Sequence, residues 1–334
     1  MTSASEIAKQ TLRDRFQNTT VEQLVGPKKH LLSFTQDETI SHAIQQLMKW
    51  DVRSAPIYSH PEKIQKAEEV SFIDFSDIIA FMIETYRQAI IEMNSHISTP
   101  VSPRRGITAQ LLQNQQISRA ILDTPVIKVA NFSKMDAHGT LTAKASALDV
   151  INQFAMGNKR IIIEDEQGMI INVVSHSDVI RLMKEVIDEN EGNTVFHATC
   201  HELQLAHELK CCADENMRTI DVFIMMSQHK VNFVPIVDED KQLVSVLSSR
   251  DIQMVSEGEF SLLDLPVIDF LSAVRQKSVN EKYPYIYCKP DSSLELIVKR
   301  LKATRVHRLI VLDNQFPSGV VSTFSLVTLL SKDN

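Results

Sequence analysis

An imidazole and a guanidinium stand side by side in the stretch TRVHRLIVLD, between a helix-like segment and a short apolar strand. The pair is His307 and Arg308. A guanidinium presents a planar fork of N–H donors that suits phosphate oxygens, and a protonated imidazole adds a second charged donor. The pair therefore predicts contact with a phosphate. The alternative is a solvated turn that binds nothing.

Basic residues recur at comparable turns elsewhere in the chain. They are Arg53, Lys159, Arg160 and, as a weaker candidate, Lys230. The sequence contains neither of the glycine-rich phosphate loops, and its eight glycines are about 2% of the chain against a usual value of about 7%. Phosphate binding would therefore depend on side chains and helix N-termini. If the turns face one another, they would form a site for a polyanion in a chain that is acidic overall.

A second set of candidate residues lies at four corners where a strand runs into a helix. The corners are Asp74–Asp77, Ser175–Asp178, Ser248–Asp251 and Ser322–Ser325. A carboxylate accepts two hydrogen bonds from a vicinal diol, so Asp77, Asp178 and Asp251 are candidates for holding a ribose. Ser325 cannot hold both oxygens of a diol, and we expect its pocket to be empty or weak.

The serines Ser175, Ser248 and Ser322 at the same corners are weaker candidates for ligand contact. Ser, Thr and Asp are also the preferred caps of helix N-termini, and acidic residues in a first turn favour the helix dipole. A purely structural capping role is therefore the alternative at each corner.

An internal repeat positions these residues. Four segments combine an amphipathic helix, a polar turn with Lys or Arg, a short apolar strand, a second strand and a second helix. The pattern predicts an α/β fold built from a strand–helix–strand–strand–helix unit of about sixty residues, which has too small a core to be stable alone. We expect repeats one and two to pair, and likewise three and four.

The expected boundaries follow from the repeat and from the loop-like segments between its copies. We predict a helical extension over 1–20 and units over 21–90, 111–188, 196–258 and 262–334. The segment 96–110 is rich in Pro, Ser, Thr and Arg and is predicted to be a loop, and 188–194 is predicted to link the two halves.

Composition excludes several classes of protein. A net charge of −7 argues against a nucleic-acid-binding protein, and no apolar run is long enough to span a bilayer. Four cysteines in an uneven arrangement do not form a disulfide framework, so we expect a reducing compartment, cytoplasmic or also nuclear. The segment HATCHELQLAHELKCC, 197–212, contains zinc-ligand residue types, but its spacing matches no established zinc pattern. We expect no metal and no catalytic site.

The repeated unit resembles the CBS module, and four copies resemble the gamma regulatory subunit of the AMP-activated protein kinase family. The similarity is carried by SSLELIVKRLKATRVHRLIVLD, DVRSAPIYS, HELQLAHEL, SQHKVNFVPIVDED and LLDLPVIDFL. The resemblance implies two pseudo-twofold pairs of modules in a flat disc. It also implies AMP, ADP or ATP as regulatory ligands, with ribose on Asp77, Asp178 and Asp251 and phosphates on the basic turn residues.

The implied function is a non-catalytic, energy-sensing subunit that works with the catalytic and scaffold subunits of a protein kinase. Asp178 and Ser325 depart from the family, whose animal members have Arg and Asp at these corners, so the pattern of occupied sites is expected to differ. Two alternatives stay open. One is a stand-alone CBS regulator of another enzyme or of a phosphatase, and the other is a scaffold with degenerate pockets.

Overall fold

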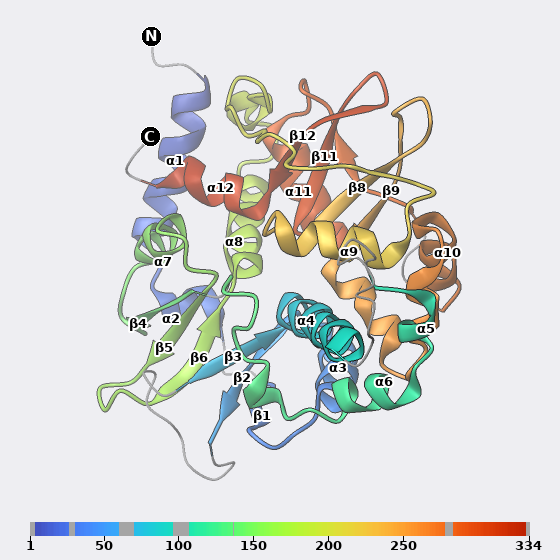
Figure 1. Ribbon diagram of the computed structural model, residues 1–334. Helices are drawn as coiled ribbons and strands as arrows, with labels where there is room; N and C mark the ends of the chain where they lie inside the picture. The colour runs from blue at the N-terminus through green and yellow to red at the C-terminus, as the bar shows by residue number, and fades with distance from the viewer. Residues whose placement is uncertain are drawn as a thin grey trace.

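The computed structural model describes residues 4–26, 31–59, 70–95, 107–135, 137–277 and 283–331. Most of the segment 96–110, which the sequence predicts to be a loop, lies outside the described residues. Within them, the strand–helix–strand–strand–helix unit occurs four times, as the repeat predicts (Figure 1).

The four modules are numbered in chain order. Module 1 contains β1 (Phe34–Thr35), α3 (Ile40–Lys49), β2 (Ser54–Tyr58), β3 (Ser71–Asp74) and α4 (Phe75–Ser95). Module 2 contains β4 (His138–Thr142), α7 (Ala147–Ala155), β5 (Arg160–Glu164), β6 (Ile170–Val174) and α8 (His176–Glu189). Module 3 contains β7 (Ala213–Asp214), α9 (Thr219–Gln228), β8 (Phe233–Val237), β9 (Leu243–Ser248) and the 3-10 helix η4 (Ser249–Val255). Module 4 contains β10 (Tyr287–Cys288), α11 (Leu294–Thr304), β11 (Arg308–Asp313), β12 (Phe316–Ser322) and α12 (Thr323–Leu330).

Shorter elements connect the modules. They are α5 (Ala109–Leu112), α6 (Gln115–Leu122) and η2 (Val126–Lys128) before module 2, η3 (Thr194–His197) before module 3, and η5 (Phe260–Asp264) and α10 (Val267–Lys277) before module 4. The second helix of module 3, predicted as an ordinary helix, is the short 3-10 helix η4. It is followed by Gly258, whose φ of 90° is a left-handed conformation that ends helical propagation.

Each sheet has the same topology, which follows from the order of elements in the repeat. The first strand pairs in parallel with the second, as β4 does with β5, because the intervening helix carries the chain back across the sheet. The second and third strands pair antiparallel, as β5 does with β6. Apolar spacing explains the first helix. In α3 the buried residues Ile40, Ala43, Ile44 and Leu47 form one stripe, and Thr39 caps the N-terminus.

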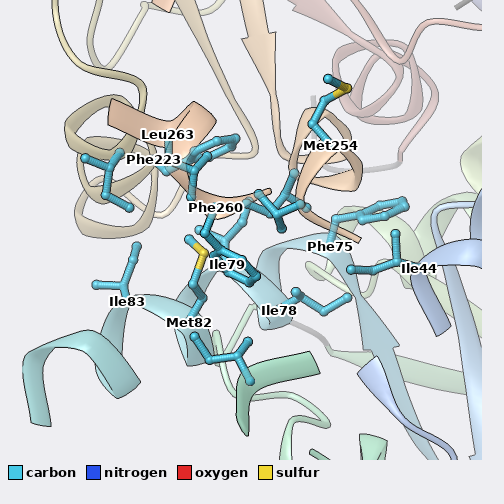
Figure 2. Packing of buried hydrophobic residues seen from close by; sticks show 14 of the residues in the cluster. Ile44, Phe75, Ile78, Ile79, Met82, Ile83, Phe223, Met254, Phe260 and Leu263 are labelled. Carbon is cyan, nitrogen blue, oxygen red and sulfur yellow. The ribbon is translucent and has the colours of Figure 1, made fainter. Parts of the chain in front are cut away.

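The two large hydrophobic cores each combine modules from both halves of the chain. One core joins the helices and strands of modules 1 and 3, and the other joins modules 2 and 4. Figure 2 shows the first core, where Ile78, Ile79 and Met82 of α4 face Phe223 of α9 and Phe260 of η5. Burying a large apolar side chain of this kind contributes about 1.5–3 kcal/mol, so these helix contacts hold the two halves together.

The sheets make the other contacts between modules. Phe72 and Ile162 belong to a small buried cluster between the sheets of modules 1 and 2. Leu243 and Ile310 belong to a matching cluster between the sheets of modules 3 and 4. The pairs are therefore 1–2 and 3–4, as the sequence predicts. Helix contacts then bring module 1 against 3 and module 2 against 4, which closes the disc (Figure 1).

The first helix, α1 (Ala4–Gln17), is part of the second core rather than a detached extension. Its buried residues Ala8, Leu12 and Phe16 pack with modules 2 and 4. Arg13 donates from Nη1 to the carbonyls of Leu330 and Ser331, at 2.9 and 2.8 Å, and so satisfies carbonyls at the end of α12. None of the helices in the described ranges is both long and apolar enough to cross a bilayer.

Candidate anion-binding site where the four modules meet

The turn between the first helix and the second strand is the same in every module. In each turn the residue three positions before the strand has a positive φ, a conformation that turns the chain sharply. These residues are Asp51 (52°), Gly157 (98°), Lys230 (50°) and Arg305 (54°). The position directly before the strand holds Arg53, Lys159, Asn232 and His307.

This register corrects one prediction from the sequence. The sequence predicts Lys230 as the module 3 equivalent of the basic turn residues, but the structure places it at the exposed positive-φ position. Asn232 occupies the place that corresponds to Arg53 and His307. The error arose because spacing alone does not show which turn residue precedes the strand.

Basic residues from all four modules converge at one place. We call Arg53, His176, Arg250, His307 and Arg308 the central cluster. Burial, followed by the charges of Arg53, Arg308, His176 and Arg250, lowers the pKa of His307 well below its ordinary value. The cluster therefore brings together module 1 (Arg53), module 2 (His176), module 3 (Arg250) and module 4 (His307 and Arg308).

The two members that the sequence did not suggest come from the strand–helix corners. His176 is the second residue of its corner and Arg250 is the third. Burial, followed by the charges of Lys159 and Arg160, lowers the pKa of His176 to about 4, and its ring stacks on Phe154 with 4.1 Å between centroids. Histidine and arginine each occur at these inner positions of the corner in only one module, so the sequence gives no signal for His176 or Arg250.

Two polar atoms of the central cluster are buried without a hydrogen-bond partner in the described part of the chain. They are Nε2 of His176 and Nε of Arg250. Native proteins pair nearly all buried polar groups, so such atoms require an explanation such as a bound ion. Both atoms belong to groups that can donate to an anion.

One carboxylate partly balances the charge. Asp51 accepts from Arg250 Nη1 at 2.7 Å and from Arg305 Nη1 at 3.1 Å. Partial burial opposes ionisation of Asp51, but the bonds and charges of these two arginines outweigh it, and the net effect lowers its pKa. Asp51 thus links module 1 to modules 3 and 4.

Arg308 and Arg160 occupy equivalent positions in the two pairs of modules, at the first residue of β11 and of β5. Arg308 donates from Nη2 to Asn232 Oδ1 at 2.5 Å and lies 4.3 Å from the ring centre of Phe233. Burial, followed by the charge of Arg53, lowers its pKa to about 9. Asn232 and Phe233 are both neutral, and an anion would balance the charge of Arg308.

Arg160 has a different environment. It donates to Ser54 Oγ, lies 3.6 Å from Asp74 Oδ2 and sits 5.0 Å from the ring centre of Phe72. Its charge is thus already matched by a carboxylate of the neighbouring module. The structure places Arg160 as a tie between modules 1 and 2, beside Lys159 at the edge of the central cluster.

All four strand–helix corners form capping boxes or their equivalent. Asp178 Oδ2 accepts from Ser175 N and Oγ, and Asp251 Oδ2 accepts from Ser248 N and Oγ. Ser325 exchanges the same type of bonds with Ser322. Capping therefore uses only one oxygen of each aspartate. A ligand contact through the other oxygen is compatible with it, so the two roles proposed for these residues do not exclude each other.

Both carboxylate oxygens of Asp77 accept hydrogen bonds from the protein. Its Oδ1 accepts from Ser133 N at 2.9 Å and from Ser133 Oγ at 2.7 Å, while Oδ2 accepts from Asp74 N. The two donors of Ser133 stand where the two hydroxyls of a diol would be needed. Burial, followed by the charge of Asp74, raises the pKa of Asp77 to about 7.

The histidines and cysteines of 197–212 do not gather around a point. Over the described ranges, no group of three or more His, Cys, Asp or Glu side chains is arranged to hold a metal ion. Cys200 is buried and contacts the buried Cys288 of module 4, whereas Cys212 is exposed.

The fold consists of four modules of the CBS type. The profile of the CBS domain matches residues 210–258 and 277–332, in modules 3 and 4. Modules 1 and 2 share the same topology in the structure.

Particular relatives extend over most of the chain. Protein SDS23 of Podospora anserina is 22% identical over 293 residues, covering 84% of this chain and 53% of the relative. Protein sds23 of Aspergillus clavatus is 24% identical over 314 residues, covering 90% and 56%. The chain therefore spans about half the length of the curated relatives it matches.

A solved structure shares the whole fold. Protein MJ1225 of Methanocaldococcus jannaschii, described as a candidate archaeal homologue of g-AMPK, superimposes with a TM-score of 0.66 at 16% identity. The match covers 94% of this chain and 100% of that protein. The arrangement of four CBS modules as two pairs in a disc is thus shared, as the resemblance to the gamma subunit implies.

Proposed function

We propose that this protein binds a phosphorylated adenine nucleotide, AMP, ADP or ATP, with its phosphates in the central cluster. The observation that carries the proposal is the convergence of five basic side chains in the central cluster. Two buried atoms there, His176 Nε2 and Arg250 Nε, have no hydrogen-bond partner among the described residues. Bringing like charges together in a partly buried place is unfavourable. A phosphate group supplies several acceptors and the opposite charge, so it would relieve both problems.

The four corners are proposed to contribute unequally to ribose binding. Asp178 and Asp251 both accept capping hydrogen bonds, and we propose that their carboxylates also meet the ribose. Asp251 is the stronger candidate, because Arg308 of the paired module binds Asn232 close to the same corner. Asp77 already holds Ser133, and Ser325 lacks a carboxylate, so these two corners are proposed to bind weakly or not at all.

The proposed role is regulatory and non-catalytic. Ligands with different numbers of phosphates would compete for the central cluster and stabilise different arrangements of the four modules, which a partner could detect. We propose the catalytic and scaffold subunits of a protein kinase as partners, with a cytoplasmic or nuclear location. The likeness to an archaeal protein described as a candidate homologue of g-AMPK supports this choice. The second candidate is a stand-alone CBS regulator of another enzyme or of a phosphatase.

Calorimetric titration with AMP, ADP, ATP and adenosine tests nucleotide binding. We expect saturable binding of the phosphorylated ligands and much weaker binding of adenosine, because adenosine cannot use the central cluster. Arg53→Ala should weaken AMP binding by about ten- to a hundredfold, the loss of a charge-assisted contact worth roughly 1.5–3 kcal/mol. Arg119→Ala, which removes an exposed arginine of α6, is the matched control and should bind normally. Equal affinity for adenosine and AMP would contradict the assignment of the phosphate site.

Purification of the tagged full chain from its own cells, followed by identification of stoichiometric partners, separates the two regulatory roles. Recovery of kinase catalytic and scaffold subunits supports the first role. Recovery of a phosphatase or another enzyme in their place supports the second role.

A further inference from the structure

His176 and His307 are the two imidazoles of the central cluster, whose other members are arginines. His176 begins α8 of module 2, and His307 precedes β11 of module 4. The charge of His176 contributes to the lowered pKa of His307, although the two residues are 131 positions apart in the chain. Their meeting point is therefore created by the packing of module 2 against module 4.

The side chains that act most strongly on these imidazoles are cationic, and an aromatic ring lies against His176. His307 faces Arg53 from the α3–β2 turn, Arg308 from β11 and Arg250 from η4. His176 faces Lys159 and Arg160 beside β5, and its ring stacks on Phe154 of α7. The largest charge effects on both rings come from cations.

The nearby carboxylates are engaged elsewhere. Asp51 accepts from Arg250 and Arg305. Asp178 and Asp251 accept from the serines of their own corners. In the unliganded protein, each added proton on an imidazole would therefore join an already positive group of side chains, and both rings stay neutral at pH 7.

We infer that a phosphate entering the central cluster binds together with protons that it draws onto His176 and His307. The inference rests on the proposed function, and it adds that the affinity of the site depends on pH. The physical reason is the reversal of the local field. A dianion placed among these residues stabilises the protonated imidazoles that the surrounding arginines disfavour. A protonated His176 could also donate from Nε2, the buried atom that has no hydrogen-bond partner in the described part of the chain.

The sign of the effect follows from linkage. If the liganded state holds more protons than the free state, affinity rises as the pH falls, by about tenfold per pH unit for each proton fully taken up. Because the two imidazoles interact, the uptake belongs to the pair and is expected to be about one proton per ligand. The site would then respond jointly to nucleotide and to acidification.

Calorimetry of the full chain with AMP at pH 7.5, repeated in buffers of different ionisation enthalpy, measures the uptake directly. A phosphomonoester with a pKa of about 6 is already about 97% dianionic at this pH, so AMP itself contributes almost no protons. We expect proton uptake from the buffer and a stronger affinity at pH 6.5 than at pH 8.0. Binding with no uptake, or with proton release, would overturn this inference while leaving the proposed function intact.

Two variants assign the protons. His176→Gln and His307→Gln should each reduce the uptake and flatten the pH dependence, since glutamine keeps a hydrogen-bonding group but cannot become charged. His201→Gln removes an exposed histidine and should leave the uptake unchanged. If both cluster variants retain the full uptake, the protons go elsewhere and the inference is wrong. If neither AMP nor ATP binds, both this inference and the proposed function are wrong.

Discussion

Replacing Arg308 by methionine should stabilise the unliganded protein while it weakens nucleotide binding. Methionine retains much of the side-chain volume and can still pack against Phe233, but it carries no charge. The equivalent arginine of the other pair, Arg160, provides a matched comparison. Its partners include the carboxylate of Asp74, so Arg160→Met should have the opposite effect on stability.

The magnitude for Arg308 follows from opposing contributions. A pKa lowered from 12.5 to about 9 corresponds to a cost of roughly 5 kcal/mol for keeping the guanidinium charged in the folded, unliganded state. This cost is fully present at any pH below the folded-state pKa, and so at pH 7. Against it stand the charged bond to Asn232, about 1.5–3 kcal/mol, and the contact with Phe233, about 1–2 kcal/mol. The net expectation is a gain of about 1 kcal/mol in the free energy of unfolding.

Urea unfolding with and without AMP measures both effects. At a ligand concentration 100 times the wild-type Kd, AMP should add about 2.7 kcal/mol to the stability of the wild type. If Arg308→Met raises Kd ten- to a hundredfold, the same concentration should add only about 0.4–1.4 kcal/mol to the stability of the variant. Arg160→Met should lose about 2–4 kcal/mol without ligand, because it leaves the largely buried carboxylate of Asp74 without its cation. If Arg308→Met is destabilised by a similar amount and keeps the full AMP effect, Arg308 is a structural tie like Arg160.

Three further substitutions test other parts of the site. Asp51→Asn should lower the free energy of unfolding by about 1 kcal/mol at pH 7, because Arg250 loses its carboxylate partner. The same change should raise the affinity for ATP measured by calorimetry. Since the pKa of Asp51 is lowered in the folded state, the difference in stability should shrink only below pH 3.8. Asp77→Asn should stabilise the protein by about 1–3 kcal/mol at pH 8, because the raised folded-state pKa makes the charged carboxylate costly at that pH. Urea unfolding should show that this gain in stability shrinks as the pH falls toward 4. Asp251→Ala should reduce AMP affinity by at least about tenfold, whereas Ser325→Ala should leave it unchanged; a loss of thermal stability with an unchanged AMP-induced shift would assign Asp251 to capping alone.

The fold was predictable because the spacing of apolar residues and the types of turn residue recur in each repeat. The stripe Ile40, Ala43, Ile44 and Leu47 fixes a helix, and the run Arg160–Glu164 fixes a buried strand, with no reference to the rest of the chain. The pairing of neighbouring modules followed from the small core of one unit. The packing of module 1 on module 3 did not, because apolar faces specify burial but not the partner that covers them.

The site was predictable in its chemistry and less so in its membership. Basic turn residues such as Arg53 and His307 were identifiable because they recur at one position of the repeat. His176 and Arg250 were missed because each occurs at its position in only one module, so repetition gave no signal. The cover of Asp77 by Ser133 could not be predicted, since the two residues are 56 positions apart and lie in different repeats. Local patterns identify residue roles, whereas long-range contacts decide which roles are open to a ligand.

The two cores that join modules 1 with 3 and 2 with 4 have a consequence for synthesis. When modules 1 and 2 have left the ribosome, the apolar faces of α4 and α8 still lack the α9–η5 region and α11 that will cover them. At about 5–20 residues per second, the second half of the chain follows on the order of ten seconds later. During that interval the first pair exposes the surfaces on which chaperones and aggregation act. The nascent chain is therefore most vulnerable halfway through its synthesis, and the native state forms cooperatively only after module 4 emerges.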